Sequence, residues 1–83
     1  MTLEEIKETA EGAILLDGFD DAIMGVVEEF GNGPRILYSK DKIISTLMND
    51  MSEEDAIDYY YYNILGMYVN AQNALFLTET KTD

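Results

Sequence analysis

The sequence predicts an α+β fold in which a small antiparallel sheet is covered by two or three helices. Three observations predict it: apolar runs bounded by turn residues, helical periodicity that begins at capping residues, and 47% hydrophobic residues in a chain of 83. Such a chain has room for one compact domain and is too apolar for intrinsic disorder. We therefore predict a single domain over residues 1–79, a disordered tail at 80–83, and the element order αβββααβ.

The first element is predicted to be a short amphipathic helix. Residues 2–5 (TLEE) fit a capping box, in which the Thr2 side chain accepts from the first turn and Glu5 reaches back to the cap. Ile6 and Ala10 then recur at helical spacing, and Gly12 provides a stop.

Three strands are predicted to follow as an antiparallel meander. Residues 13–16 (AILL) form a brief apolar run closed by an Asp-Gly turn, and residues 22–30 form a longer β-prone run. After the turn residues 31–34 (GNGP), residues 35–38 resume the extended pattern. Residues 74–78 (ALFLT) are also β-prone, so we predict a C-terminal strand that joins this sheet.

Two helices are predicted between the meander and the last strand. Ser39 is a good N-cap for a helix with apolar residues at 43, 44, 47 and 48. Ser52 is the second N-cap, and it is followed by three carboxylates at positions that the helix dipole favours. This second helix should extend to about residue 68, unless Gly66 ends it.

Four consecutive tyrosines, residues 59–62, are the most unusual feature of the chain. Successive helical residues are about 100° apart, so the four rings cannot all face one core. Two stripes are predicted to cover the sheet, namely Ala56, Tyr60, Ile64, Met67 and, beside them, Ile57, Tyr61, Leu65, Tyr68. Because tyrosine is favoured at protein interfaces, the interface candidates are Tyr59, Tyr62 and Tyr68. The alternative is that these rings lie flat on the surface without a partner.

The chain is strongly acidic, with 17 Asp and Glu against 5 Lys and Arg and a formal net charge of -12. Such a surface repels phosphate backbones and anionic membranes, so we predict neither direct nucleic-acid binding nor membrane binding. The charge is consistent with two further interpretations. It keeps a small protein soluble, or its carboxylates mimic the phosphates of a nucleic acid and inhibit a protein that binds one.

Asp17, Asp20 and Asp21 form a dense acidic loop between two of the predicted strands. Carboxylate oxygens are ligands for calcium and magnesium, so a divalent-cation site is one hypothesis. The spacing lacks the alternating ligands, central Gly and distal Glu of an EF-hand. Asp residues at turns bond their own backbone, and the turn interpretation is favoured.

The residue types that are missing limit the chemistry. The chain has no Cys and no His, which removes the common zinc sites and the Ser-His-Asp and Cys-His nucleophile arrangements. The GNGP turn lacks the lysine and helix start of a phosphate-binding loop. We therefore predict no enzymatic activity and no cofactor. No apolar run approaches about 20 residues and the N-terminus is not signal-like, so a cytoplasmic location is expected.

Several segments resemble a family of small proteins from bacteriophages, including cyanobacterial phages, and from some bacteria. The residues that carry the resemblance are Asp17 to Ala22 (DGFDDA), Gly25, Tyr38, Met51 to Ala56 (MSEEDA), Tyr60, Tyr62, Asn63, Gly66, Tyr68 and Val69. The family has no assigned activity to transfer. The resemblance implies a phage-type interaction protein whose partner is a host or viral protein, while the residue pattern itself favours self-association as a homodimer.

Overall fold

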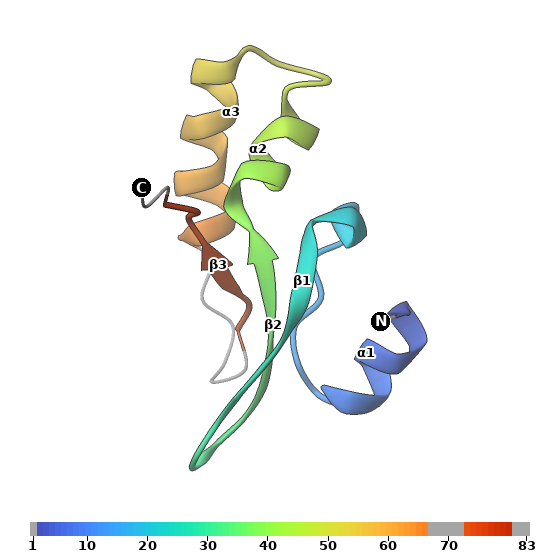
Figure 1. The fold of residues 1–83 in the computed structure, drawn as a ribbon. Coiled ribbons are helices and arrows are strands. Elements are labelled where there is room, and N and C mark those ends of the chain that lie inside the picture. The colour runs from blue at the N-terminus through green and yellow to red at the C-terminus, as the bar shows by residue number, and fades with distance from the viewer. Residues whose placement is uncertain (1, 67–72, 81–83) are drawn as a thin grey trace.

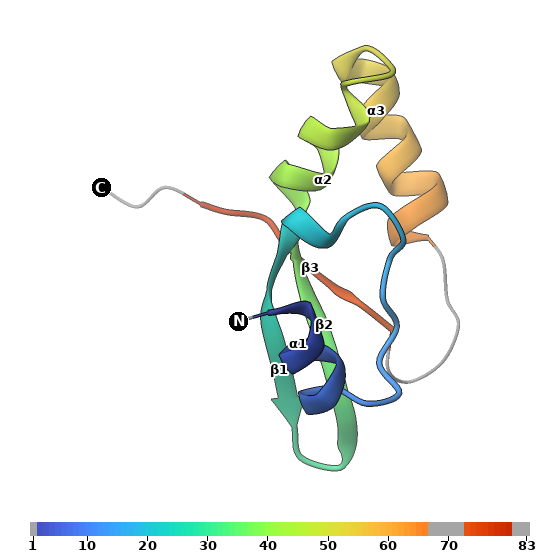
Figure 2. The ribbon, with the colours of Figure 1, turned by 90° about the vertical axis from the view of Figure 1, so that its right-hand side faces the viewer.

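The computed structural model describes residues 2–66 and 73–80 and confirms the α+β fold (Figure 1). Within these residues a three-stranded sheet is accompanied by three α-helices, a short 3-10 helix and a π-helical segment. Helices α2 (Lys40–Leu47) and α3 (Glu53–Tyr59) extend the molecule beyond one end of the sheet (Figure 1). The hairpin of β1 (Ile23–Glu29) and β2 (Asn32–Ser39) forms the other end, and helix α1 (Leu3–Thr9) lies beside it (Figure 2).

The sheet has the order β1-β2-β3 and is mixed. Strand β1 (Ile23–Glu29) pairs antiparallel with β2 (Asn32–Ser39), and Gly31 in the turn adopts a φ of 84°, which favours glycine. Strand β3 (Leu75–Leu77) pairs in parallel with the last three residues of β2. Pro34 therefore lies where β2 pairs with β1 alone among the described strands, and its missing N–H costs no bond to β3.

The meander prediction was wrong at its first strand, because residues 13–16 form no strand. This run is apolar because it packs on the core: Leu16 is buried, and Ala13 and Leu15 contact the buried cluster. The Leu16 N–H donates to the Tyr38 hydroxyl at 2.7 Å, so one of its backbone groups is satisfied without a neighbouring strand. The C-terminal strand is confirmed, but as a parallel partner of β2, since two helices form the crossover.

The predicted helix starts are confirmed by their caps. Helix α1 (Leu3–Thr9) follows Thr2, whose side chain accepts from the Glu5 N–H at 3.2 Å. Ser39 ends β2 and caps α2 (Lys40–Leu47), with 3.3 Å between its Oγ and the Lys42 N–H nitrogen. Ser52 caps α3 (Glu53–Tyr59) in the same way at 3.2 Å from the Asp55 nitrogen. Each cap satisfies a backbone donor that the first helical turn leaves free.

The helix that carries the four tyrosines, called the tyrosine helix below, spans residues 53–65 and changes from α to π winding. Helix α3 passes directly into the π-helical segment η2 (Tyr60–Leu65), and Gly66 caps its end. An α-helix drifts by about 40° over each four-residue step, so Ala56, Tyr60 and Ile64 would leave a common line. The wider π turn opposes this drift, and all three side chains are buried while Asn63 is exposed. A Cβ added at Gly66 would lie 3.1 Å from the Tyr62 carbonyl oxygen, so glycine also suits this close turn.

One buried cluster joins the elements. Its fully buried large side chains are Ile36 and Tyr38 of β2, Ile43 of α2 and Tyr60 of η2. Ile6 of α1 and Ala10, which caps the end of that helix, belong to the same cluster. The cluster therefore holds the tyrosine helix against the sheet. Among residues 2–66 and 73–80, no helix is long and apolar enough to cross a membrane.

Candidate functional site

The inner side of the tyrosine helix is part of an aromatic cluster. Tyr60 is only 2% exposed, and its ring meets Phe76 of β3 edge-on with 5.5 Å between centroids. Phe76 in turn stacks on Tyr38 of β2 at 6.1 Å. These geometries are those that aromatic rings prefer. Tyr60 therefore serves the core, as the stripe prediction required.

Burial sets the acidity of the two core tyrosines. Loss of solvent raises the pKa of Tyr38; the hydrogen bond from Leu16 opposes this rise, and the nearby Asp20 carboxylate adds to it. Burial likewise raises the pKa of Tyr60, with a smaller contribution from Tyr61. In both phenols the raised pKa favours the neutral form.

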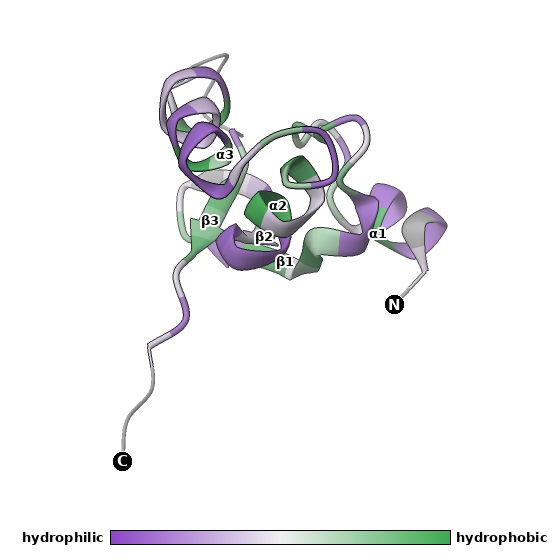
Figure 3. Cartoon of the chain, turned by 90° about the horizontal axis from the view of Figure 1, so that it is seen from above, coloured by the Kyte–Doolittle hydropathy of each residue, from purple (hydrophilic) through white to green (hydrophobic). Residues whose placement is uncertain are grey.

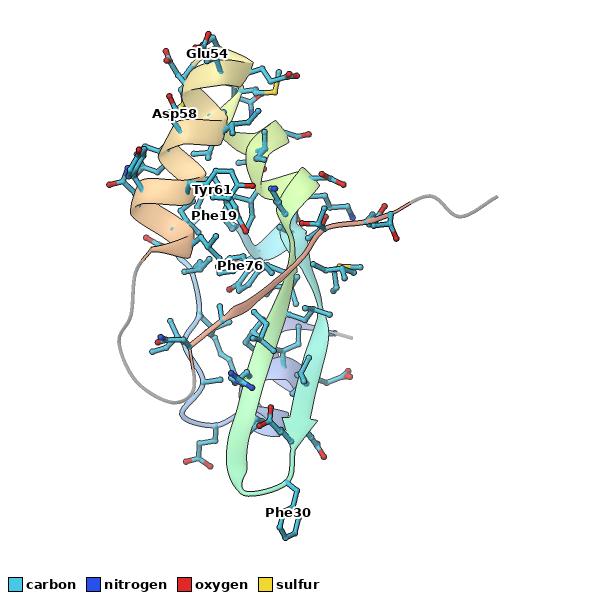
Figure 4. The ribbon with its side chains drawn as sticks, turned by 90° about the vertical axis from the view of Figure 1, so that its left-hand side faces the viewer. Phe19, Phe30, Glu54, Asp58, Tyr61 and Phe76 are labelled. Carbon is cyan, nitrogen blue, oxygen red and sulfur yellow. The ribbon has the colours of Figure 1, made fainter. Side chains whose placement is uncertain are left out.

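Lys40, at the start of α2, is held by the rim of this cluster. Its Nζ donates to the Tyr61 hydroxyl at 2.7 Å and lies 4.8 Å from the Tyr61 ring centroid and 5.5 Å from that of Tyr60. These distances suit cation–π attraction. Tyr61, predicted to lie on a sheet-covering stripe, is 46% exposed and covers Lys40 at the rim. Figure 4 shows Tyr61 turned toward the strands and Phe76.

The outer side of the same helix carries tyrosines that the core does not use. Tyr59 is 44% exposed and Tyr62 is 82% exposed. Asp55 and Asp58, which stand four residues before Tyr59 and Tyr62 respectively, are also exposed. We call these four residues, Asp55, Asp58, Tyr59 and Tyr62, the tyrosine face. The predicted exposure of Tyr59 and Tyr62 is observed, and their role at an interface stays a prediction. Tyr68, the third interface candidate, lies outside the described residues.

The acidic loop has the geometry of a turn. Gly18 adopts a φ of 88°, and Asp20 and Asp21 begin the 3-10 helix η1 (Asp20–Ala22), where the Ala22 N–H donates to the Phe19 carbonyl at 2.9 Å. Asp17, Asp20 and Asp21 are not brought together as ligands. Across the described part of the chain, no group of three or more His, Cys, Asp or Glu could hold a metal ion. The described geometry thus offers no support for the cation-site hypothesis.

The acidic residues are spread over several elements rather than gathered in one groove. They lie on α1, on the η1 loop, at the hairpin end and on α3. Figure 3 shows hydrophilic segments on both α1 and α3, with hydrophobic strands between them. A nucleic-acid mimic needs carboxylates arranged along one surface, and this spread does not single out such a surface.

Sequence reasoning missed two features of the surface. Phe30, placed by the pattern at the end of a strand, occupies the hairpin turn before Gly31 and is fully exposed (Figure 4). The signal for this was the Gly31 residue that follows it, since a positive φ there makes a two-residue turn. The second missed feature is the contact of Lys40 with the Tyr60 and Tyr61 rings. The position of Lys40 directly after the Ser39 cap gave no sign of these contacts.

Comparison with protein families, with curated proteins and with solved structures found no match to this chain. The resemblance to small phage proteins therefore stays a prediction.

Proposed function

We propose that this protein is a small, non-enzymatic interaction module that binds another protein through its tyrosine face. The observation that carries the proposal is the contrast between two tyrosines in one short helix. Tyr60 is 2% exposed and fills the core, whereas Tyr62, two residues later, is 82% exposed. The Tyr62 ring contributes little to the core and is therefore available for contact with a partner.

The free energy available at this face is appreciable. An aromatic side chain buries on the order of 150 to 250 Å² when it is fully covered, and apolar area contributes about 25 cal/mol per Å². Covering the exposed parts of Tyr59 and Tyr62 would therefore contribute a few kcal/mol to association. The hydroxyl groups remain free to bond at the polar rim of a contact.

The π-helical segment supports the same proposal. Such segments are rare and occur frequently at functional sites. Here η2 keeps Tyr60 and Ile64 on the core while Tyr62 and Asn63 stay outside. The change of winding thus presents polar and aromatic groups without loosening the core contact.

Two kinds of partner fit the proposal in general terms. A second copy of this chain would give the predicted homodimer, and a distinct protein would give a hetero-complex. If the protein is of phage type, as the resemblance implies, that distinct protein belongs to the host or the virus. Either occupant should depend on the same exposed rings.

The test compares the wild-type chain with the double variant Tyr59→Ser/Tyr62→Ser. Sedimentation equilibrium at high micromolar concentration measures self-association, and immobilised protein measures capture of proteins from an extract of the producing cells. The control is Met24→Ser/Met48→Ser, which replaces two exposed apolar side chains outside the tyrosine face, 46% and 42% exposed.

The proposal expects an association that the tyrosine variant loses and the methionine variant keeps. Circular dichroism should show both variants folded, because all four side chains are on the surface. If neither self-association nor any captured protein depends on Tyr59 and Tyr62, the proposal is wrong.

A further inference from the structure

The carboxylates of α3 have no cation beside them within the described residues. Glu53, Glu54, Asp55 and Asp58 are all exposed, and none of them takes part in a salt bridge among those residues. An ion pair among the described residues lies instead at the hairpin, between Arg35 and Glu29 at 2.7 Å. The field around Tyr59 and Tyr62 is therefore negative, and the described residues do not compensate it.

The same helix already demonstrates how its rings accommodate a cation. Lys40 lies over Tyr61 at 4.8 Å from the ring centroid and donates to the hydroxyl of that ring at 2.7 Å. Tyr59 and Tyr62 have comparable rings on the outer side, with Asp55 and Asp58 next to them in place of a lysine. A ring face beside a carboxylate is a favourable site for an arginine or lysine side chain.

A second copy of the chain is a poor source of that cation. The full chain has a net charge of -12 and five basic residues. Two of these are already engaged, Arg35 with Glu29 and Lys40 with Tyr61. Two tyrosine faces brought together would place like charges against each other, which opposes association.

We infer that the tyrosine face binds a basic segment of another protein, with arginine or lysine side chains over Tyr59 and Tyr62 and paired with Asp55 and Asp58. This inference rests on the proposed function and specifies its partner. The exposed rings provide cation–π attraction and apolar contact area. The carboxylates attract and orient the basic side chains, which makes association fast and sensitive to salt.

The experiment titrates the isotopically labelled chain with a synthetic peptide of alternating arginine and alanine and follows amide chemical shifts by NMR. The control peptide has citrulline, a neutral analogue of similar shape, in place of each arginine. Binding of the arginine peptide should shift the amides of Asp55, Asp58, Tyr59 and Tyr62. It should weaken at least tenfold in about 1 M NaCl, where the screening length falls to about 3 Å.

Two pairs of variants separate this site from general attraction to an acidic protein. Tyr59→Ser/Tyr62→Ser should weaken binding of the arginine peptide about tenfold by removing both rings. Asp55→Asn/Asp58→Asn should weaken it more than Glu4→Gln/Glu8→Gln, which removes the same charge from α1. Equal losses from the two charge variants would mean that net charge alone attracts the peptide, and would overturn the inference.

The outcomes also distinguish this inference from the proposed function. Equal binding of the citrulline peptide, or no binding of either peptide, overturns the basic-partner inference. The proposed function still stands in that case if capture or self-association depends on Tyr59 and Tyr62. If that dependence is also missing, the proposed function fails with it.

Discussion

The two sides of the tyrosine helix use one residue type for different purposes. On the inner side, Tyr60 packs between Phe76 and Tyr61 and is almost completely buried. On the outer side, Tyr62 is largely exposed, and no ring contact joins it to another described residue. The role of a tyrosine in this helix therefore depends on its angular position around the helix axis.

This difference separates stability from recognition. A buried ring contributes to the free energy of unfolding, while an exposed ring contributes little to folding and is free to contribute to binding. Substitutions on the two sides should therefore have effects of different size and on different measurements.

The largest effect is expected from Tyr60→Ala. Removing a buried aromatic side chain leaves a cavity and should lower the free energy of unfolding by about 3 to 5 kcal/mol. A domain of this size has roughly 5 to 10 kcal/mol in total, so the variant should be close to unfolding at 37 °C. Urea denaturation measures the loss. A change below about 1 kcal/mol would contradict the inner assignment of Tyr60.

The next largest effect is expected from high pH, which should lower the free energy of unfolding through Tyr38 and Tyr60. The pKa of Tyr38 and that of Tyr60 are raised in the folded state, so their neutral forms are favoured there. Stability from this source is fully present below the unfolded pKa of about 10 and falls as pH rises above it, by up to about 1.4 kcal/mol per pH unit for each group. Denaturation midpoints between pH 8 and pH 11 measure the slope, and Tyr60→Phe should make it shallower.

Tyr38→Phe tests the buried hydrogen bond that the coil at residues 13–16 makes with the sheet. The substitution keeps the ring but leaves the Leu16 N–H without its acceptor. An unsatisfied buried donor costs about 1 to 3 kcal/mol. Thermal or urea unfolding measures this loss. Amide hydrogen exchange at Leu16 should also accelerate, and unchanged protection there would contradict the predicted role of this bond.

Lys40→Met tests the contacts that Lys40 makes with the Tyr60 and Tyr61 rings at the edge of the aromatic cluster. The variant keeps the aliphatic stem but removes the cation from the Tyr60 and Tyr61 rings and the hydrogen bond to the Tyr61 hydroxyl. Because the site is partly open to solvent, we expect a loss of about 0.5 to 1 kcal/mol in unfolding free energy. The loss should shrink in the Tyr61→Phe background, which already lacks the hydroxyl, and an undiminished loss would argue against the bond.

The smallest effect on folding is expected from Tyr62→Ser on the outer side. This side chain is largely exposed, so the free energy of unfolding should change by no more than about 0.5 kcal/mol. Association should weaken clearly in the same variant. A stability loss comparable to that of Tyr60→Ala would place Tyr62 in the core and remove the contrast between the two sides.

Much of this fold was predictable because its signals are local. Thr2, Ser39 and Ser52 begin helices at the residues that capping chemistry indicated. The exposure of Tyr59 and Tyr62 followed from helical geometry, since four adjacent rings exceed one face. The same geometry put Ala56, Tyr60 and Ile64 on the buried stripe.

Other features could not be predicted because their causes are distant in the sequence. The apolar run at residues 13–16 suits a strand as well as a packed coil, and its bond to Tyr38, 22 residues after Leu16, selects the coil. The contacts of Lys40 depend on a helix that starts 13 residues later.

Capping and periodicity act over a few residues, so the sequence alone predicts the fold class, the helix starts and a helix with more tyrosines than one face can bury. The parallel pairing of β3 with β2, the π winding at the end of the helix and the ring contacts of Lys40 are visible in the tertiary structure alone. These depend on packing between segments far apart in the chain. Burial of a shared core selects among local conformations that differ little in free energy.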